Sequence, residues 1–181
     1  SLISQYKITD QVIDAWCAIL NATPGSRLLL RNAALGKNSN RQFLRSQFLD
    51  RGIAIERISL EGPAPHFEFL ETYKRIDIAL DAFPYNGGTT TMEALWQGVP
   101  VISYWGDRWV ARTSATLLRA AGLDELLATD VSGYVDLATQ LHAIERAVAE
   151  AKRALIHDHI DHCVTGVDAR MLRPMIGAQT P

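Results

Sequence analysis

Apolar positions along this chain recur at two spacings, one typical of helices and one typical of buried strands. Residues 8 to 22 predict a helix, because their apolar side chains return every three to four positions. Those positions are Ile8, Val12, Ile13, Trp16, Ile19 and Leu20. Thr9 or Asp10 can cap the start of this helix, and Pro24 and Gly25 end it.

Short apolar runs and helical stretches alternate over the rest of the chain. Predicted strands lie within residues 27–31, 53–60, 76–80, 99–103 and 125–128. Predicted helices span residues 39–51, 66–74, 89–97, 109–121 and 132–156. Strands that alternate with helices favour a parallel sheet with right-handed crossovers. The sequence therefore predicts an α/β, Rossmann-like lobe over residues 1–156, with helices on both faces of a parallel sheet, and a tail over residues 157–181.

Composition and charge narrow the class of protein. Apolar residues make up 48% of the chain and charged residues 21%, with a net charge of -2. This charge gives no general attraction to nucleic acid or to an anionic membrane, and neither partner is expected. No apolar run reaches the roughly 20 residues that span a bilayer. Cys17 and Cys163 form no disulfide framework and suit the cytoplasm. The first residue is Ser1, as in a fragment of a longer protein.

The most informative chemistry lies in residues 77–100, where a strand leads through a Pro and Gly turn into a helix that begins with three threonines. The exposed N–H groups and partial positive charge of a helix start can bind a diphosphate. The hydroxyls of Thr89 and Thr90 add donors. Glu93, one turn into the helix, can accept two hydrogen bonds from a ribose diol. Ligands bind such sheets beyond the carboxyl ends of the strands. This segment directly follows a predicted strand, so it predicts a nucleotide site there.

Spacing alone leaves a second interpretation of the same residues, namely a capped helix after a tight turn. Threonine and glycine are common at helix starts for structural reasons. The G-x-G-x-x-G pattern of dinucleotide-binding folds and the Walker lysine are both absent, so neither of those nucleotide classes is supported.

Residues 77–100 resemble the C-terminal lobe of O-GlcNAc transferases and their bacterial relatives, glycosyltransferase family 41. The resemblance is carried by Asn86-Gly87-x-Thr89-Thr90 and by Leu95-Trp96-x-Gly98-x-Pro100, and it continues through Gly106, Arg112, Leu117-Leu118 and residues 122–128. It also includes Tyr6-Lys7-Ile8, which is similar to the family's lysine-bearing segment. It implies the GT-B architecture, in which a UDP-sugar lies between two Rossmann-like lobes and is held mostly by the C-terminal one.

The resemblance also implies roles for individual residues. Lys7 would neutralise the leaving diphosphate, so that no metal is needed. Gly88, Thr89 and Thr90 would lie at the diphosphate, and Glu93 would hold the ribose. One branch of the family has histidine at the position of Gly88 and aspartate at that of Glu93, so here backbone donors must replace the histidine. Without the resemblance, Lys7 reads as a solvated lysine before a helix.

Four further residues have two interpretations each. Residues 62–66 would border the uracil, with Pro65 and His66 similar to the Pro-His of bacterial members, although His66 could simply cap a short helix. Arg112 could bind phosphate, but a pairing with an acidic neighbour is the more favoured interpretation. Trp96 is expected in the core rather than as a platform for a sugar ring.

The tail contains residues that are similar to metal ligands, namely His157, Asp158, His159, His162 and Cys163. The spacing of the three histidines does not keep them on one face of a helix, where neighbours lie three or four residues apart. We therefore expect no metal site and no cofactor, the UDP-sugar being a substrate.

The function implied is inverting transfer of N-acetylglucosamine from UDP-GlcNAc to Ser or Thr of proteins. A separate N-terminal lobe, possibly preceded by tetratricopeptide repeats, would bind the protein or peptide acceptor, so this lobe alone would turn over poorly. The alternatives are transfer of glucose from UDP-glucose to asparagine, a UDP-GlcNAc 2-epimerase, which has less motif support, and a non-catalytic module that binds a UDP-sugar. The presence of Lys7, Thr89, Thr90 and Glu93 favours a competent site.

Overall fold

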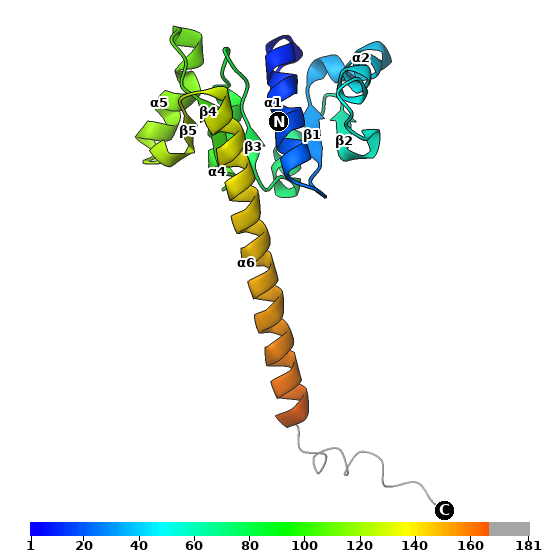
Figure 1. The fold of residues 1–181 in the computed structure, drawn as a ribbon, viewed down its shortest axis with the longest axis vertical. Helices are drawn as coiled ribbons and strands as arrows, with labels where there is room; N and C mark the ends of the chain where they lie inside the picture. The colour runs from blue at the N-terminus through cyan, green and yellow to red at the C-terminus, as the bar shows by residue number, and fades with distance from the viewer. Residues whose placement is uncertain (167–181) are drawn as a thin grey trace, which may run out of the picture. The chain divides into compact units, whose positions relative to one another are not determined.

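Helices and strands alternate along the chain, as predicted (Figure 1). The computed structural model describes the backbone of residues 1–166 and the side chains of residues 1–151 and 154. The helices are α1 (Asp10–Ala22), α2 (Asn38–Leu49), α3 (His66–Glu71), α4 (Thr89–Trp96), α5 (Thr113–Ala120) and α6 (Val131–Gly166). The strands are β1 (Leu28–Arg31), β2 (Ile58–Glu61), β3 (Ala79–Leu80), β4 (Val101–Tyr104) and β5 (Leu127–Ala128).

The chain divides into two compact units, Ser1–His142 and Ala143–Pro181. Helix α6 continues beyond residue 156, where the sequence predicts its end, as far as Gly166. The predicted boundary between a lobe of residues 1–156 and a tail stays a prediction. Within residues 1–166, no helix combines the length and the apolar character that crossing a membrane requires.

Helix α1 forms where its apolar period and its capping residue predict it. The Thr9 hydroxyl accepts a hydrogen bond from the Val12 N–H at 3.4 Å, which satisfies one of the first unpaired amides of the helix. At the other end the Thr23 N–H donates to the Ile19 carbonyl. The apolar face is buried, and Trp16 is completely covered. Burial of this face is the main stabilisation of such a helix.

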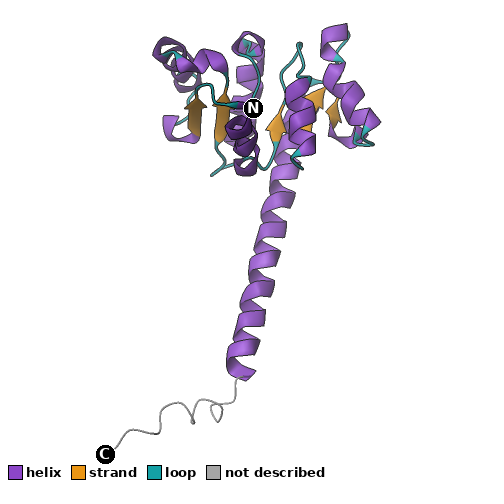
Figure 2. Ribbon diagram, turned by 180° about the vertical axis from the view of Figure 1, so that it is seen from behind, coloured by secondary structure: helices purple, strands orange, loops and turns teal. Residues whose placement is uncertain are grey.

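Every strand pair within residues 1–166 is parallel, which confirms the predicted α/β class. Hydrogen bonds divide the strands into two sheets, β1–β2 and β3–β4–β5. Both appear as orange arrows among the helices in Figure 2. Along β1, the Ser1 amino group donates to the Leu29 carbonyl at 2.6 Å, and the Arg31 N–H donates to the Ser1 carbonyl at 3.3 Å. Within the described residues no backbone hydrogen bond joins β1 to β3, and a cavity of about 390 Å³ is lined by residues of both, including Leu29 and Leu80.

A buried hydrogen-bonded chain ties three elements together beneath the end of β3. The Trp16 indole N–H of α1 donates to the Tyr134 hydroxyl of α6 at 3.2 Å, and that hydroxyl donates to the Asp81 carbonyl at 2.7 Å. Tyr134 is completely buried, and burial raises the pKa of its hydroxyl, which therefore stays protonated. Its ring also packs edge-on against Phe83. These two hydrogen bonds fix the point at which the backbone leaves β3.

Replacing Tyr134 by phenylalanine is expected to lower the free energy of unfolding by about 1–3 kcal/mol, because the Trp16 N–H and the Asp81 carbonyl both lose their buried partner. Urea denaturation monitored by circular dichroism measures the effect as a lower midpoint with an unchanged slope. Tyr104→Phe is the matched control. Its ring also packs on Phe83, and its hydroxyl makes no hydrogen bond within the described residues. Equal losses in the two variants would contradict the prediction.

Candidate functional site

A buried carboxylate closes the turn that follows β3. Asp81 is only 3% exposed, and its Oδ1 accepts hydrogen bonds from the Ala82 N–H at 2.9 Å and from the Gly87 N–H at 2.7 Å. Its Oδ2 accepts from the Ser103 hydroxyl on β4 at 2.7 Å. The same side chain therefore holds both ends of the turn and anchors it to the neighbouring strand. Asp81 was not among the residues predicted for the site, although a carboxylate directly after a predicted strand could have drawn attention to it.

Gly87 is required by steric packing. A Cβ atom at this position would lie 2.7 Å from the Thr91 hydroxyl and 3.0 Å from that of Thr90. The Gly87 carbonyl accepts from the Ser114 hydroxyl at 3.2 Å, and Ser114 pairs with Thr91 at 2.8 Å. Thr91 is buried and serves this packing, so of the three threonines it is the structural one.

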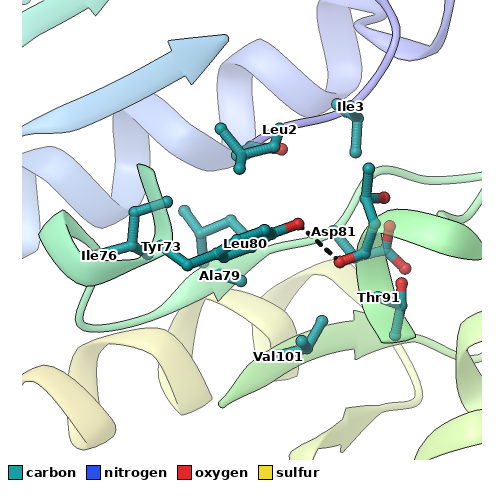
Figure 3. A pocket seen from close by; sticks show the side chains of 11 residues that line it. Leu2, Ile3, Tyr73, Ile76, Ala79, Leu80, Asp81, Thr91 and Val101 are labelled. Carbon is teal, nitrogen blue, oxygen red and sulfur yellow. Dashed lines mark hydrogen bonds between the residues drawn. The ribbon is translucent and has the colours of Figure 1, made fainter. Parts of the chain in front are cut away.

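The first turn of α4 presents backbone and hydroxyl donors next to this turn. Gly88 is the N-cap residue, and no side chain caps the helix. Within the described residues, the N–H groups of Thr89 and Thr90 have no hydrogen-bond acceptor. The Tyr73 hydroxyl donates to the Thr90 carbonyl at 2.9 Å, the contact that is dashed in Figure 3. The helix start is thus held in place while its donors stay available to an anion.

Lys7 lies beside the same turn, although 79 residues separate it from Asn86 in the sequence. Its ammonium Nζ donates to the Asn86 carbonyl at 2.6 Å and lies 4.1 Å from the centre of the Tyr85 ring. Tyr85 in turn packs against Tyr6, with ring centres 5.9 Å apart. The structure therefore brings the predicted lysine to the predicted diphosphate motif.

Glu93 is half-buried one turn into α4. Its carboxylate makes no hydrogen bond or ion pair within the described residues. Burial first, and then the charge of Glu93, raises the pKa of Tyr73. Tyr73 belongs to the short 3-10 helix Thr72–Arg75 that directly follows α3.

Pro65 and His66 lie at the other end of the same segment, at the start of α3. Pro65 precedes α3 and His66 begins it, and both side chains are exposed. Within the described residues, neither forms a hydrogen bond with the turn at Asn86. The link between α3 and the turn is instead Tyr73, through its contact with Thr90.

Arg112 has a structural contact rather than the acidic partner that the sequence analysis favoured. Its guanidinium Nε donates to the Gly106 carbonyl at 3.1 Å, and the group lies 5.3 Å from the Trp105 ring centre. No acidic side chain pairs with it within the described residues. Arg112 is exposed, and it supports the loop that follows β4.

The prediction that Trp96 lies in the core is wrong, because 89% of this residue is exposed. Helix α4 turns Thr91 and Ala94 inward, whereas Met92 and Trp96, four residues apart, share its outer face. The side chains of His157, Asp158, His159, His162 and Cys163 lie outside those that the structure describes.

Together these residues form an arrangement suited to an anion. A lysine ammonium and the positive end of α4 both lie at the turn from Asn86 to Thr90. Helix N-termini and lysine ammonium groups are recurrent ligands of phosphate groups. Asp81 accepts a hydrogen bond from Gly87, and Tyr73 donates one to Thr90, so the donors of the turn are positioned before any ligand binds.

Known proteins are similar to this chain in fold and in sequence. The structure is similar to that of a lysine-to-methionine mutant of the O-GlcNAc transferase from Thermobaculum terrenum, with a TM-score of 0.76 and 40% sequence identity over 77% of this chain and 27% of that one. A probable UDP-N-acetylglucosamine–peptide N-acetylglucosaminyltransferase SPINDLY from Petunia hybrida is 34% identical over 150 residues, covering 82% of this chain and 16% of the relative. A UDP-N-acetylglucosamine–peptide N-acetylglucosaminyltransferase from Caenorhabditis elegans is 32% identical over 75% of this chain and 12% of its own length.

The chain thus spans about a sixth of the length of the Petunia relative. The family model described as glycosyl transferase family 41 matches residues 2–164, which is nearly the whole chain. This match confirms the resemblance that the turn and lysine motifs carry. The chain belongs to glycosyl transferase family 41.

Proposed function

We propose that this chain is the donor-binding lobe of a glycosyltransferase that moves N-acetylglucosamine from UDP-N-acetylglucosamine to Ser or Thr side chains of proteins. The observation that carries the proposal is the meeting of the Lys7 ammonium with the start of α4 at one turn. The relatives support the donor and the acceptor class, because their names specify N-acetylglucosaminyl transfer to peptides.

In this proposal the diphosphate of UDP binds at the start of α4. The backbone of Gly88 and the N–H and hydroxyl groups of Thr89 and Thr90 donate hydrogen bonds to it. Lys7 stabilises the negative charge that the leaving UDP gains as the bond to the sugar breaks, which makes a metal ion unnecessary. Glu93 accepts hydrogen bonds from the ribose diol.

We assign the uracil to the region of Pro65 and His66. The contact between Tyr73 and Thr90 supports this assignment, since it connects the α3 segment to the phosphate turn. Arg112 has its contact with Gly106, so a direct role at phosphate needs that arginine to turn away from the loop.

Acceptor recognition belongs, in this proposal, to an N-terminal lobe and to tetratricopeptide repeats outside these 181 residues. The large share of the relatives that this chain does not cover leaves room for such parts. Transfer of glucose from UDP-glucose is less well supported, since the relatives are named for N-acetylglucosamine. A non-catalytic UDP-sugar-binding module is a further alternative. The cytoplasmic location stays a prediction.

UDP is expected to bind the 181-residue chain with a dissociation constant between about 1 µM and 1 mM, that is, with about 4–8 kcal/mol of binding free energy. Isothermal titration calorimetry measures it, with uridine as the comparison ligand. Uridine should bind more weakly, because it lacks the diphosphate that α4 and Lys7 would hold. Absence of heat with UDP at millimolar concentration would count against the proposed donor site.

A further inference from the structure

The peptide group between Asn86 and Gly87 is hydrogen-bonded on both sides. Its carbonyl, on Asn86, accepts from the Lys7 ammonium at 2.6 Å, and its N–H, on Gly87, donates to the Asp81 carboxylate at 2.7 Å. In a planar trans peptide the N–H and C=O groups point in opposite directions. One rigid plane therefore joins a buried acid to the lysine at the candidate donor site.

We propose that Asp81 is a positioning residue for Lys7, acting through the Asn86–Gly87 peptide. By accepting the Gly87 N–H, the carboxylate sets the orientation of this plane and so the place of the carbonyl oxygen that holds the ammonium. The role of Lys7 in transfer rests on the proposed function. The positioning of its ammonium by Asp81 is a separate claim, and it can be tested without turnover.

Asp81 is itself held firmly enough to act in this way. The Ser103 hydroxyl and the Ala82 N–H bind its carboxylate, and the Tyr134 hydroxyl binds its backbone carbonyl. Asp81 and its neighbours on β3 also line a small cavity of about 20 Å³ beneath Leu2 and Ile3, which Figure 3 shows. A carboxylate with these contacts has no freedom to follow a moving peptide, so the peptide follows the carboxylate.

Positioning requires an oxygen on residue 81 that accepts the hydrogen bond from the Gly87 N–H, and it does not require the negative charge of the carboxylate. Within the described residues no cation pairs with the Asp81 carboxylate. Burial raises the pKa of Asp81, and the hydrogen bonds from Ser103, Gly87 and Ala82 oppose that rise. A neutral asparagine keeps the oxygen that accepts from Gly87 and is therefore expected to substitute well. Alanine removes the acceptor and leaves the peptide able to rotate.

The reactivity of the Lys7 amine reports its position directly. We would measure reductive methylation of Lys7 in the folded 181-residue chain by peptide mass spectrometry over time. Asp81→Ala is expected to raise the methylation rate about 2- to 10-fold, the factor that the loss of one hydrogen bond to the ammonium corresponds to. Asp81→Asn should leave the rate unchanged. An unchanged rate in a folded Asp81→Ala chain would overturn the inference.

A matched variant separates positioning from general loosening. Thr23 has a buried hydroxyl that donates to the Ile19 carbonyl and pairs with Ser26, away from the turn. Thr23→Val should therefore not change the Lys7 rate, and a rise equal to that of Asp81→Ala would overturn the inference. If Asp81→Ala does not fold by circular dichroism, Ser103→Ala takes its place. Freeing one carboxylate oxygen should raise the rate, and no change would again contradict the inference.

The complete enzyme supplies the second readout, a double-mutant cycle on kcat. If Asp81 acts through Lys7, adding Asp81→Ala to Lys7→Ala should lower kcat little further, whereas a purely structural role would give additive losses. The two claims fail in different ways. Unchanged turnover in Lys7→Ala alone would refute the proposed function of the lysine. The methylation rates would still decide whether Asp81 positions it.

Discussion

Replacing Lys7 by alanine in the complete enzyme is expected to lower kcat by about 10²- to 10³-fold, the usual effect of removing one group that stabilises charge in a transition state. The affinity for UDP should fall much less, because the donors at the start of α4 remain. Steady-state kinetics gives kcat, and calorimetry with UDP gives the affinity.

The physical reason for this split lies in when the charge appears. Bound UDP-sugar already carries a diphosphate, to which Thr89 and Thr90 can donate. The additional negative charge arises only as the bond to the sugar breaks. A cation held beside the Asn86 carbonyl stabilises that late charge most strongly, so its loss affects the transition state more than the ground state.

Lys37→Ala is the matched control for this experiment. Lys37 directly precedes α2, as Lys7 precedes α1 by three residues, but the Lys37 side chain is exposed and makes no hydrogen bond or ion pair within the described residues. It should leave kcat unchanged. Equal losses of kcat and of UDP affinity in Lys7→Ala would show that Lys7 only binds the donor.

A methyl group on Gly87 is expected to weaken UDP binding by about 5- to 150-fold, the factor that corresponds to the 1–3 kcal/mol that overpacking typically costs. In Gly87→Ala the new Cβ would lie 2.7 Å from the Thr91 hydroxyl and 3.1 Å from the Asp81 carboxylate. These groups are buried and hydrogen-bonded, so they cannot give way without moving the turn. Calorimetry with UDP measures the loss, and thermal unfolding shows whether the chain remains folded.

The neighbouring glycine provides the control. A Cβ on Gly88 would meet only the Thr113 methyl group at 3.6 Å, which is an ordinary contact. Gly88→Ala should therefore keep the UDP affinity within about 3-fold, well below the cost of overpacking. The open space beside Gly88 also agrees with the resemblance, in which one branch of the family has histidine at this position. Similar losses in both variants would show that packing around Gly87 is not what limits binding.

Local patterns predicted much of the secondary structure. The predicted helix over residues 8–22 forms at Asp10–Ala22, with Thr9 at its cap, because the apolar period and the capping hydroxyl act within a few residues. Where a prediction joined two elements, tertiary contacts explain the difference. The predicted helix over residues 109–121 divides at Arg112, since the Val110 carbonyl of the 3-10 turn Trp109–Ala111 accepts a hydrogen bond from the Asn86 N–H.

The candidate site was predictable in its parts and not in its assembly. The glycines and threonines after β3 predict a helix start after a tight turn from their own spacing, and the resemblance adds the expectation that this start binds a diphosphate. Which threonine is structural depends on Ser114, a residue from α5. The exposure of Trp96 likewise depends on which face of α4 the rest of the chain covers.

By itself the sequence determined the alternation of helices and strands, the turn before α4 and, through the resemblance, the family. These properties rest on interactions between residues close along the chain or on motifs that can be read directly. Only the tertiary structure decided that Lys7 reaches Asn86 across 79 residues and that the Asp81 carboxylate lies on the other side of the same peptide. Such contacts arise when distant segments pack together, and no local periodicity encodes the atoms that then meet.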